Sequence, residues 1–180
     1  MHNLAQPVRM YYMGPFFRYE RPQAGRYREL HQFGIEVIGD ESASTDAEVI
    51  EFAWRVLESV GVNDVKLLLN SIGDWDCRPS YVKALQSYYY SESIEHEDCK
   101  RRLHNNPLRL LDCKYDTCQA LIAGAPKSLD YLCESCILHW HNLIRYLEMT
   151  GITYEIENRL VRGLDYYTRT VFELVPPKAG

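Results

Sequence analysis

The most constraining feature of this sequence is an alternation of side chains near its N-terminus. Residues 12–20 and 28–39 place apolar side chains at every second position, with polar or small residues between them. A β-strand directs successive side chains to opposite faces, so this period of two predicts strands. The intervening residues include Pro22 and Gly25, which favour a tight turn. We therefore predict a β-hairpin with one apolar packing face.

The other face of this hairpin carries polar side chains. It holds Arg18 and Glu20 on the first strand and Gln32 and Glu36 on the second. A solvent-facing strand shows the same polarity. Here, however, glycines share the face and leave space above the sheet, which a solvated face does not need. We interpret this face as a binding surface.

In the rest of the chain, the spacing of apolar residues indicates helices and strands before and after a segment of different composition. Residues 74–130 are rich in tyrosine and charge and contain several prolines, and we interpret them as a small helical insertion. Residues 1–73 and 131–180 flank it and are predicted to share a core. The expected elements of that core are a helix over 45–60, a buried strand over 65–69, a helix over 134–149, and strands over 152–156 and 170–174.

Charge and hydropathy limit the classes of function. The 180 residues carry a net charge of −5, and no apolar run approaches the roughly 18 residues that a membrane helix needs. Residues 1–39 carry five Arg and three acidic residues, whereas the remainder carries 15 basic and 22 acidic residues. The local Arg excess suits a small anionic ligand, because guanidinium groups bind phosphate and carboxylate. We expect a cytoplasmic protein, and the acidic remainder disfavours a tRNA-binding module.

The chain contains six cysteines, and its N-terminus shows no basic-then-apolar secretory signal, so we do not expect a disulfide framework. Two pairs, Cys113-x4-Cys118 and Cys133-x2-Cys136, have a spacing that resembles a four-thiolate Zn²⁺ site. Alternatively, these four are small apolar residues of the insertion. Both interpretations stay open, and Cys77 and Cys99 are expected to be free thiols.

Two segments carry more specific patterns. The segment from Phe17-Arg18-Tyr19-Glu20 to Gln32-Phe33-Gly34-Ile35-Glu36 closely resembles motif 2 of the class II aminoacyl-tRNA synthetases. The segment Leu160-Val161-Arg162-Gly163-Leu164-Asp165-Tyr166-Tyr167-Thr168 resembles the signature of the histidyl-tRNA synthetases within that class. Residues 105–112 are similar to the insertion domain of that family. The resemblance covers nearly the whole chain.

This resemblance implies a fold and an activity. The implied fold is α+β, with part of the antiparallel sheet of the class II catalytic domain and a small helical insertion. The implied activity is the ATP-dependent activation of histidine and its transfer to tRNA(His), with Mg²⁺ as a cofactor and a homodimer as the assembly. Because the reaction brings two anions together, it needs fixed positive charge, which Arg supplies without a change of protonation.

The resemblance also implies residues for the ATP site. Arg18 is expected to bind the α-phosphate, and Glu20 to support placement of the nucleotide. Arg26 is expected to reach the terminal phosphates. Leu30 stands where the family usually has a phenylalanine, so it can pack on adenine but lacks π-stacking.

For the histidine site, the resemblance implies a second set. Gln32 is expected to contact the backbone end of histidine, and Glu36 to accept a hydrogen bond from its imidazole. Tyr167 is expected to contact the other ring nitrogen, and Tyr166 to form a wall of the pocket. Arg162 is expected to be the catalytic cation at the α-phosphate.

Several family elements have no match in the chain, including motif 1, motif 3 and the anticodon-binding domain. We therefore expect a fragment of a catalytic domain that is a weak catalyst alone and self-associates. The rival interpretation is the synthetase-like regulatory subunit of ATP phosphoribosyltransferase, which binds histidine without catalysis. It generally lacks the insertion and does not need the full set of Arg18, Arg26 and Arg162, so these features favour the enzyme.

Overall fold

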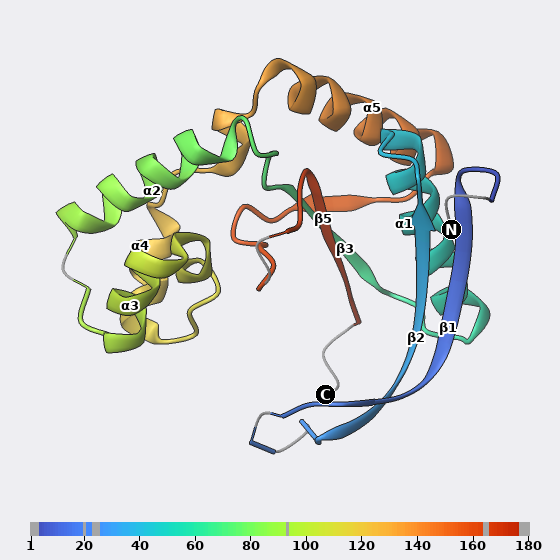
Figure 1. Cartoon of the computed structure of the whole chain (residues 1–180), viewed down its shortest axis with the longest axis horizontal. Coiled ribbons are helices and arrows are strands. Elements are labelled where there is room, and N and C mark those ends of the chain that lie inside the picture. The colour runs from blue at the N-terminus through green and yellow to red at the C-terminus, as the bar shows by residue number, and fades with distance from the viewer. Residues whose placement is uncertain (1–3, 20, 23–25, 93, 164–165, 177–180) are drawn as a thin grey trace.

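The computed structural model describes residues 4–19, 21–22, 26–92, 94–163 and 166–176. A long hairpin lies beside two helices on one side of the molecule, a small sheet lies in the middle, and a group of helices lies on the other side (Figure 1). The elements in chain order are β1 (Val8–Phe17), β2 (Glu29–Ile38), α1 (Ala43–Ser59), β3 (Lys66–Ser71), α2 (Arg78–Ser91), α3 (Glu97–Asn105), η1 (Pro107–Leu110), α4 (Asp116–Ala123), η2 (Ser128–Tyr131), α5 (Glu134–Thr150), β4 (Tyr154–Ile156) and β5 (Thr170–Val175).

Strands β1 and β2 form the predicted antiparallel hairpin. Its apolar face was expected to be a packing face, but Met13 is 80% exposed and Phe17 is 76% exposed. On β2 the ring of Phe33 stacks on Phe52 of α1, with ring centres 6.4 Å apart. Helix α1 thus lies against β2, and the packing prediction is wrong for these two residues of β1.

The second sheet has β3 at its centre, with strand order β4-β3-β5. Strand β5 runs antiparallel to β3, but β4 runs parallel to it, so the expectation of an antiparallel sheet is wrong for this pair. Parallel neighbours need a long crossover between them. The chain between β3 and β4 provides one, because it contains the whole helical insertion and α5.

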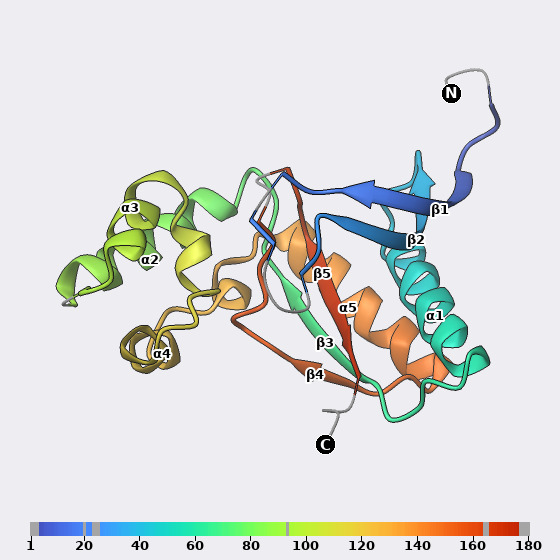
Figure 2. The ribbon, with the colours of Figure 1, turned by 90° about the horizontal axis from the view of Figure 1, so that it is seen from below.

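Helices α1 and α5 bury one side of this sheet. Leu67 and Leu69 of β3 are almost fully buried against Ile50 of α1 and Leu143 of α5. Figure 2 shows the two helices side by side along the strands. Helix α5 ends at Gly151, which adopts a left-handed conformation with φ of 71° that favours glycine. This element was predicted closely.

The segment between β3 and α5 is helical and has a separate apolar core. This core contains Tyr81 and Leu85 of α2, Leu103 of α3 and Ile122 of α4, together with buried cysteines. Within the described part of the chain, no helix combines the length and apolar character needed to cross a membrane.

Candidate functional site

The polar face of the hairpin carries a row of side chains along β2. Leu30, Gln32 and Glu36 share one face because they are separated by even numbers of residues. Opposite them on β1 lie Phe16, Gly14 and Met10 respectively, and open space lies above Gly14. The expected space above the glycines is therefore open at Gly14 but not at Gly34, where a Cβ would overlap the ring of Tyr12.

The predicted ATP residues lie toward the free end of the hairpin. The backbone N–H of Arg18 donates to the carbonyl of Arg28 at 2.7 Å, which extends the strand pairing beyond β1. Arg18 follows Met10, the partner of Glu36, by eight residues, so the two ends of the face are about 26 Å apart along the strand. Arg26 is exposed at the same free end, and Glu20 lies outside the described residues.

The signature segment brings three predicted residues together. The rings of Tyr166 and Tyr167 stack with centres 4.8 Å apart. The guanidinium carbon of Arg162 lies 5.4 Å from the centre of the Tyr167 ring, which is within cation–π range. Arg162 and Tyr167 also line a cavity of about 250 Å³ with Thr170 and Phe172 of β5.

Glu36 lies close enough to this group to affect it electrostatically. A hydrogen bond with Tyr167 raises the pKa of Tyr166 above its ordinary value, and the negative charge of Glu36 adds to this effect. Glu36 is the smallest of these influences, and the positive charge of Arg162 acts in the opposite direction. The hairpin end that carries Arg18 and Arg26 extends away from the central sheet (Figure 1).

A buried arginine supports the signature segment and was not predicted from the sequence. Nε of Arg78 donates to the carbonyl of Ile72 at 3.2 Å, and Nη2 donates to the carbonyl of Gly73 at 3.1 Å. The same Nη2 also donates to the carbonyl of Tyr167. Nothing in the sequence around Arg78 distinguishes it from a surface arginine, because its acceptors are backbone carbonyls of folded loops.

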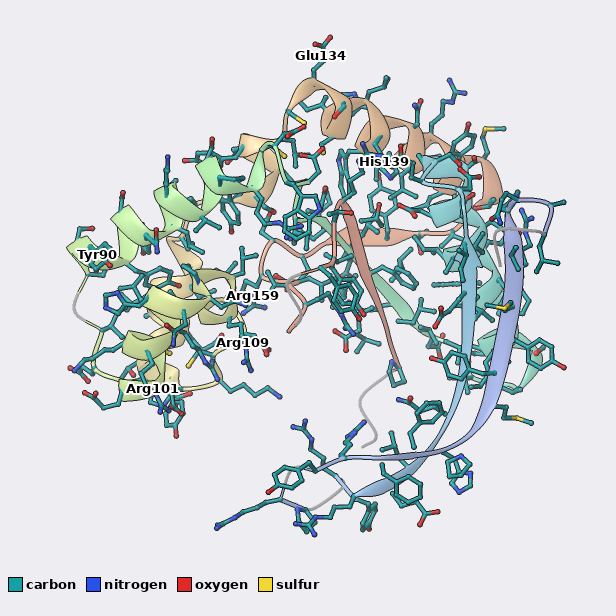
Figure 3. The ribbon with its side chains drawn as sticks, viewed as in Figure 1. Tyr90, Arg101, Arg109, Glu134, His139 and Arg159 are labelled. Carbon is teal, nitrogen blue, oxygen red and sulfur yellow. The ribbon has the colours of Figure 1, made fainter. Side chains whose placement is uncertain are left out.

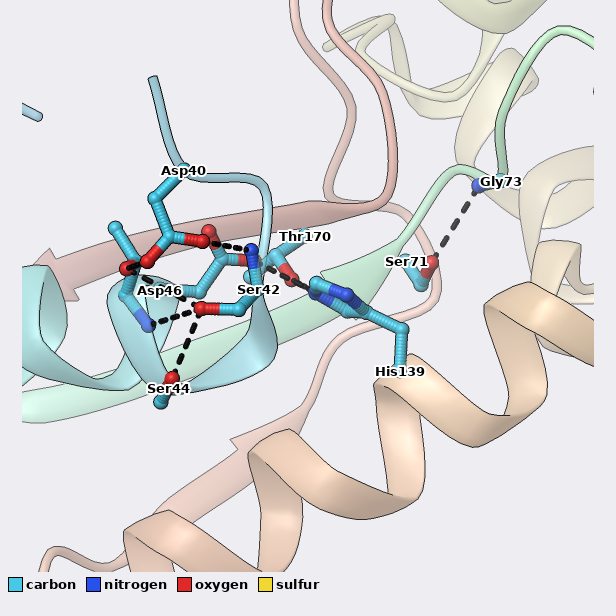
Figure 4. A network of polar contacts seen from close by, with 9 residues as sticks. Asp40, Ser42, Ser44, Asp46, Ser71, Gly73, His139 and Thr170 are labelled. Carbon is cyan, nitrogen blue, oxygen red and sulfur yellow. Dashed lines mark hydrogen bonds and ion pairs between the residues drawn. The ribbon is translucent and has the colours of Figure 1, made fainter. Parts of the chain in front are cut away.

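A second polar network joins three elements beside a cavity. Nε2 of His139 lies 2.9 Å from the Asp46 carboxylate of α1 and 3.3 Å from the Thr170 hydroxyl of β5 (Figure 4). His139 points inward from α5, whereas Glu134 at the start of the same helix points away (Figure 3). The cavity, of about 400 Å³, is lined by His139, Asp46, Arg169 and further acidic residues. His139 follows Cys136 by three residues and precedes Leu143 by four, so helical spacing places it on the buried face of α5, and this pattern could have identified it.

The structure contradicts the predicted four-cysteine Zn²⁺ site. Cys113 and Cys118 lie with Cys99 and a histidine, whereas Cys133 and Cys136 lie with other partners in a separate group. Helix α4 and η2 carry the chain from the first group toward α5, so the two pairs do not meet. Spacing along the chain could not reveal the partners that complete each group.

The second of these groups consists of Asp74, Cys77, Cys133 and Cys136. Cys77 and Cys99 are free cysteines, as expected, but each lies within a group of potential metal ligands. Burial raises the pKa of Cys136 to about 12, and its hydrogen bond to Asp74 acts in the same direction. Burial opposes the ionisation of Asp74, yet hydrogen bonds from the Cys136 thiol and the Cys77 backbone hold the pKa of Asp74 below its ordinary value.

Comparison with known proteins places this geometry in a family. Residues 1–77 match the family model described as histidyl-tRNA synthetase. The chain is 52% identical over its whole length to a histidine–tRNA ligase from Dehalococcoides mccartyi and spans 43% of that protein. The structure matches the apo histidyl-tRNA synthetase of S. aureus with a TM-score of 0.71 and 38% identity, covering 96% of this chain and 40% of the other.

A more distant structure shares the fold alone. It is described as an ATP phosphoribosyltransferase regulatory subunit/histidyl-tRNA synthetase from Bacillus halodurans. It matches with a TM-score of 0.62 and 21% identity, over 99% of this chain and 50% of that one.

The hydrogen bonds of Arg78 predict a loss of stability in Arg78→Ala. Removal of the guanidinium leaves buried carbonyls without a donor, so the free energy of unfolding should fall by about 2 kcal/mol. Urea denaturation measures this loss. The control is Lys83→Ala on the exposed side of α2, which should change stability by less than about 0.5 kcal/mol. Equal effects of the two substitutions would contradict the supporting role.

Proposed function

The chain belongs to the histidyl-tRNA synthetase family, and from this premise we propose that it forms part of an enzyme that activates histidine with ATP and transfers it to tRNA(His). The observation that carries the proposal is the 52% identity with a histidine–tRNA ligase over the whole chain. The chain spans about 43% of the length of the curated relatives that it matches, so the activity of the complete protein is part of the proposal.

In the proposed reaction, the carboxylate of histidine attacks the α-phosphorus of ATP, which enters as its Mg²⁺ complex. The bond to the β-phosphate oxygen breaks, pyrophosphate leaves, and histidyl-adenylate remains. A ribose hydroxyl at the end of tRNA(His) then attacks the carbonyl carbon, and AMP leaves. Negative charge develops on phosphoryl oxygens, which a preorganised guanidinium stabilises.

The histidine site is proposed between β2 and the signature segment. Glu36 would accept the imidazole N–H, Tyr167 would contact the other ring nitrogen, and Tyr166 would form the wall. Support comes from the stacked tyrosines and from the electrostatic effect of Glu36 on Tyr166. Gln32 would bind the backbone end of histidine above the gap at Gly14. Pairing both ring nitrogens discriminates strongly against apolar amino acids.

The ATP site is proposed along the rest of the hairpin. Arg162 and Arg18 would contact the α-phosphate, Arg26 the terminal phosphates, and Leu30 the adenine; Glu20 would support nucleotide placement. Leu30 and Gln32 share the face of Glu36, which supports a common binding surface, and the ring of Tyr12 covers Gly34 between Gln32 and Glu36. Because the Arg18 end extends away from the sheet, this proposal requires the hairpin end to bend toward Arg162 when ATP binds.

We also propose an assembly and a domain division for the chain. The exposed apolar face of β1, with Met13 and Phe17, supports a homodimer in which this face is covered. The separate apolar core of α2, α3 and α4 supports division into residues 1–73, the insertion 74–130, and residues 131–180. A cytoplasmic location completes the proposal.

Pyrophosphate exchange with histidine tests the proposed activity. We expect weak exchange from the 180-residue chain and strong exchange from a chain extended to the length of its relatives, because the extension would complete the walls of the site. Histidine binding without any exchange in the extended chain would instead favour the regulatory-subunit alternative, with which the chain shares a fold.

The proposed role of Arg162 predicts a loss of rate. In the extended chain, Arg162→Ala should reduce adenylate formation by roughly 2–4 kcal/mol in transition-state stabilisation, with a smaller loss in histidine binding. Pyrophosphate exchange gives the rate and calorimetry gives the binding. The control, Arg159→Ala, removes a guanidinium that pairs with Glu157 in the same segment and should leave the rate nearly unchanged. Equal losses of rate and binding would remove Arg162 from catalysis.

The proposed role of Glu36 predicts a loss of selectivity. Glu36→Gln replaces a charged acceptor by an amide that can also present its NH₂ group, so the affinity for histidine should fall by about tenfold or more. Calorimetric titration with histidine measures this change. Glu29→Gln on the opposite face of β2 is the matched control. Unchanged affinity in Glu36→Gln would contradict the assignment.

A further inference from the structure

All six cysteines of the chain fall into two groups outside the proposed active site. In each group, four side-chain donor atoms lie within 4.8 Å of one another. The group in the helical insertion, here the insertion cluster, consists of His96, Cys99, Cys113 and Cys118. The group where the insertion joins the core, here the junction cluster, consists of Asp74, Cys77, Cys133 and Cys136.

The distances within the insertion cluster match those around a tetrahedral metal. Four sulfurs about 2.3 Å from one Zn²⁺ would be about 3.8 Å apart, and a nitrogen ligand would lie slightly closer to them. Sγ of Cys99 lies 3.7 Å from Sγ of Cys118. Nδ1 of His96 lies 3.2 Å from Sγ of Cys99 and 3.7 Å from Sγ of Cys113.

Two simpler interpretations explain this cluster less well. A disulfide is excluded because its sulfurs would be about 2.05 Å apart, whereas those of Cys99 and Cys118 are 3.7 Å apart. Apolar packing explains the burial of three cysteines but not why a ring nitrogen of His96 is turned toward their sulfurs.

The ring of His96 is also held in place by a neighbouring side chain. Its ring packs on Tyr115, with centres 3.8 Å apart. Nε2, which faces away from the sulfurs, lies 4.0 Å from the carboxylate of Asp98. This separation exceeds a hydrogen bond, so the packing on Tyr115 is the contact that holds the ring.

We propose that the insertion cluster binds one structural Zn²⁺ through Nδ1 of His96 and the thiolates of Cys99, Cys113 and Cys118. His96 and Cys99 lie at the start of α3, and Cys118 lies in the first turn of α4. The positive ends of the two helices stabilise thiolates there. Four protein ligands close the coordination sphere, so the ion fastens α3 to α4 in a core too small to be very stable alone.

We propose a second Zn²⁺ site at the junction cluster, from a separate set of contacts. Sγ of Cys77 lies 3.9 Å from Sγ of Cys136, and Oδ2 of Asp74 lies 3.1 Å from Sγ of Cys136 and 3.7 Å from Sγ of Cys133. The other oxygen, Oδ1, accepts the backbone N–H of Asp76 at 3.1 Å, which orients the carboxylate. These spacings also fit one tetrahedral ion.

The surroundings of the junction cluster suit a metal site with excess negative charge. Three thiolates and one carboxylate around Zn²⁺ carry a net charge of about −2, and the Arg169 side chain interacts with both Cys136 and Asp74. A Cβ on Gly73 would lie 2.6 Å from Sγ of Cys77, so this sulfur position requires glycine there. A second Zn²⁺ bound here fastens the start of the insertion to its end.

Metal analysis of the untagged 180-residue chain, purified without chelator, tests both sites. We expect about two zinc ions per chain. His96→Ala should reduce the content by about one, whereas His96→Cys, which restores a fourth ligand as a thiolate, should retain it. His104→Ala, on the exposed side of α3, is the matched control and should retain both ions.

The junction site has its own variants. Asp74→Ala should reduce the zinc content by about one, and Asp74→Cys should retain both ions. Asp76→Ala, an exposed residue of the same turn, is the control. A content that does not change in either alanine variant would overturn the site concerned, and a chain without zinc would overturn both.

Cobalt substitution keeps the test valid if a variant fails to fold. Co²⁺ added to the metal-depleted wild-type chain should produce visible bands of tetrahedral geometry and intense thiolate-to-cobalt absorption, saturating at about two equivalents. Saturation at one equivalent would overturn one of the two sites. The site that does bind cobalt would then be identified by which substitution, His96→Cys or Asp74→Cys, changes the absorption. Absence of these bands would overturn both.

Discussion

The architecture depends on the pairing of β3 with strands that follow the insertion. Leu67 pairs with Tyr154 of β4 on one side and with Leu174 of β5 on the other. Because β3 precedes the insertion and both partners follow it, the chain must leave the core and return to nearly the same place. The core is therefore completed only after the insertion has folded back, and any contact that holds its two ends together also stabilises the sheet.

Buried polar side chains at this junction hold the backbone of the signature segment. The side-chain amide of Asn70 on β3 donates to the carbonyl of Leu160 at 3.0 Å, and Arg78 donates to the carbonyl of Tyr167. The segment that carries Arg162 is thus held near both ends by residues that flank the start of the insertion. A buried donor is costly to remove, because the carbonyl that it satisfies has no access to water.

Local periodicity predicted the parts of the molecule that depend on near neighbours. The period of two indicated the hairpin and the common face of Gln32 and Glu36, and the glycine after α5 marked its end. Properties that depend on distant partners were not predictable in this way. The direction of β4 depends on how the whole crossover folds back, and the cysteine grouping depends on the fold of the insertion. The spacing of Cys113 and Cys118 contains no information about His96.

The junction cluster and the proposed active site are connected through adjacent residues. Cys77 is a proposed metal ligand, and Arg78, the next residue, donates to the backbone of Tyr167. Cys77 occupies the N-cap position of α2 without a capping hydrogen bond from its side chain, and Arg78 is the first residue of the helix. A metal at the junction would therefore hold the start of the insertion without contacting substrate. In this proposal the start of the insertion helps to hold the backbone of Tyr167, because Arg78 donates to its carbonyl.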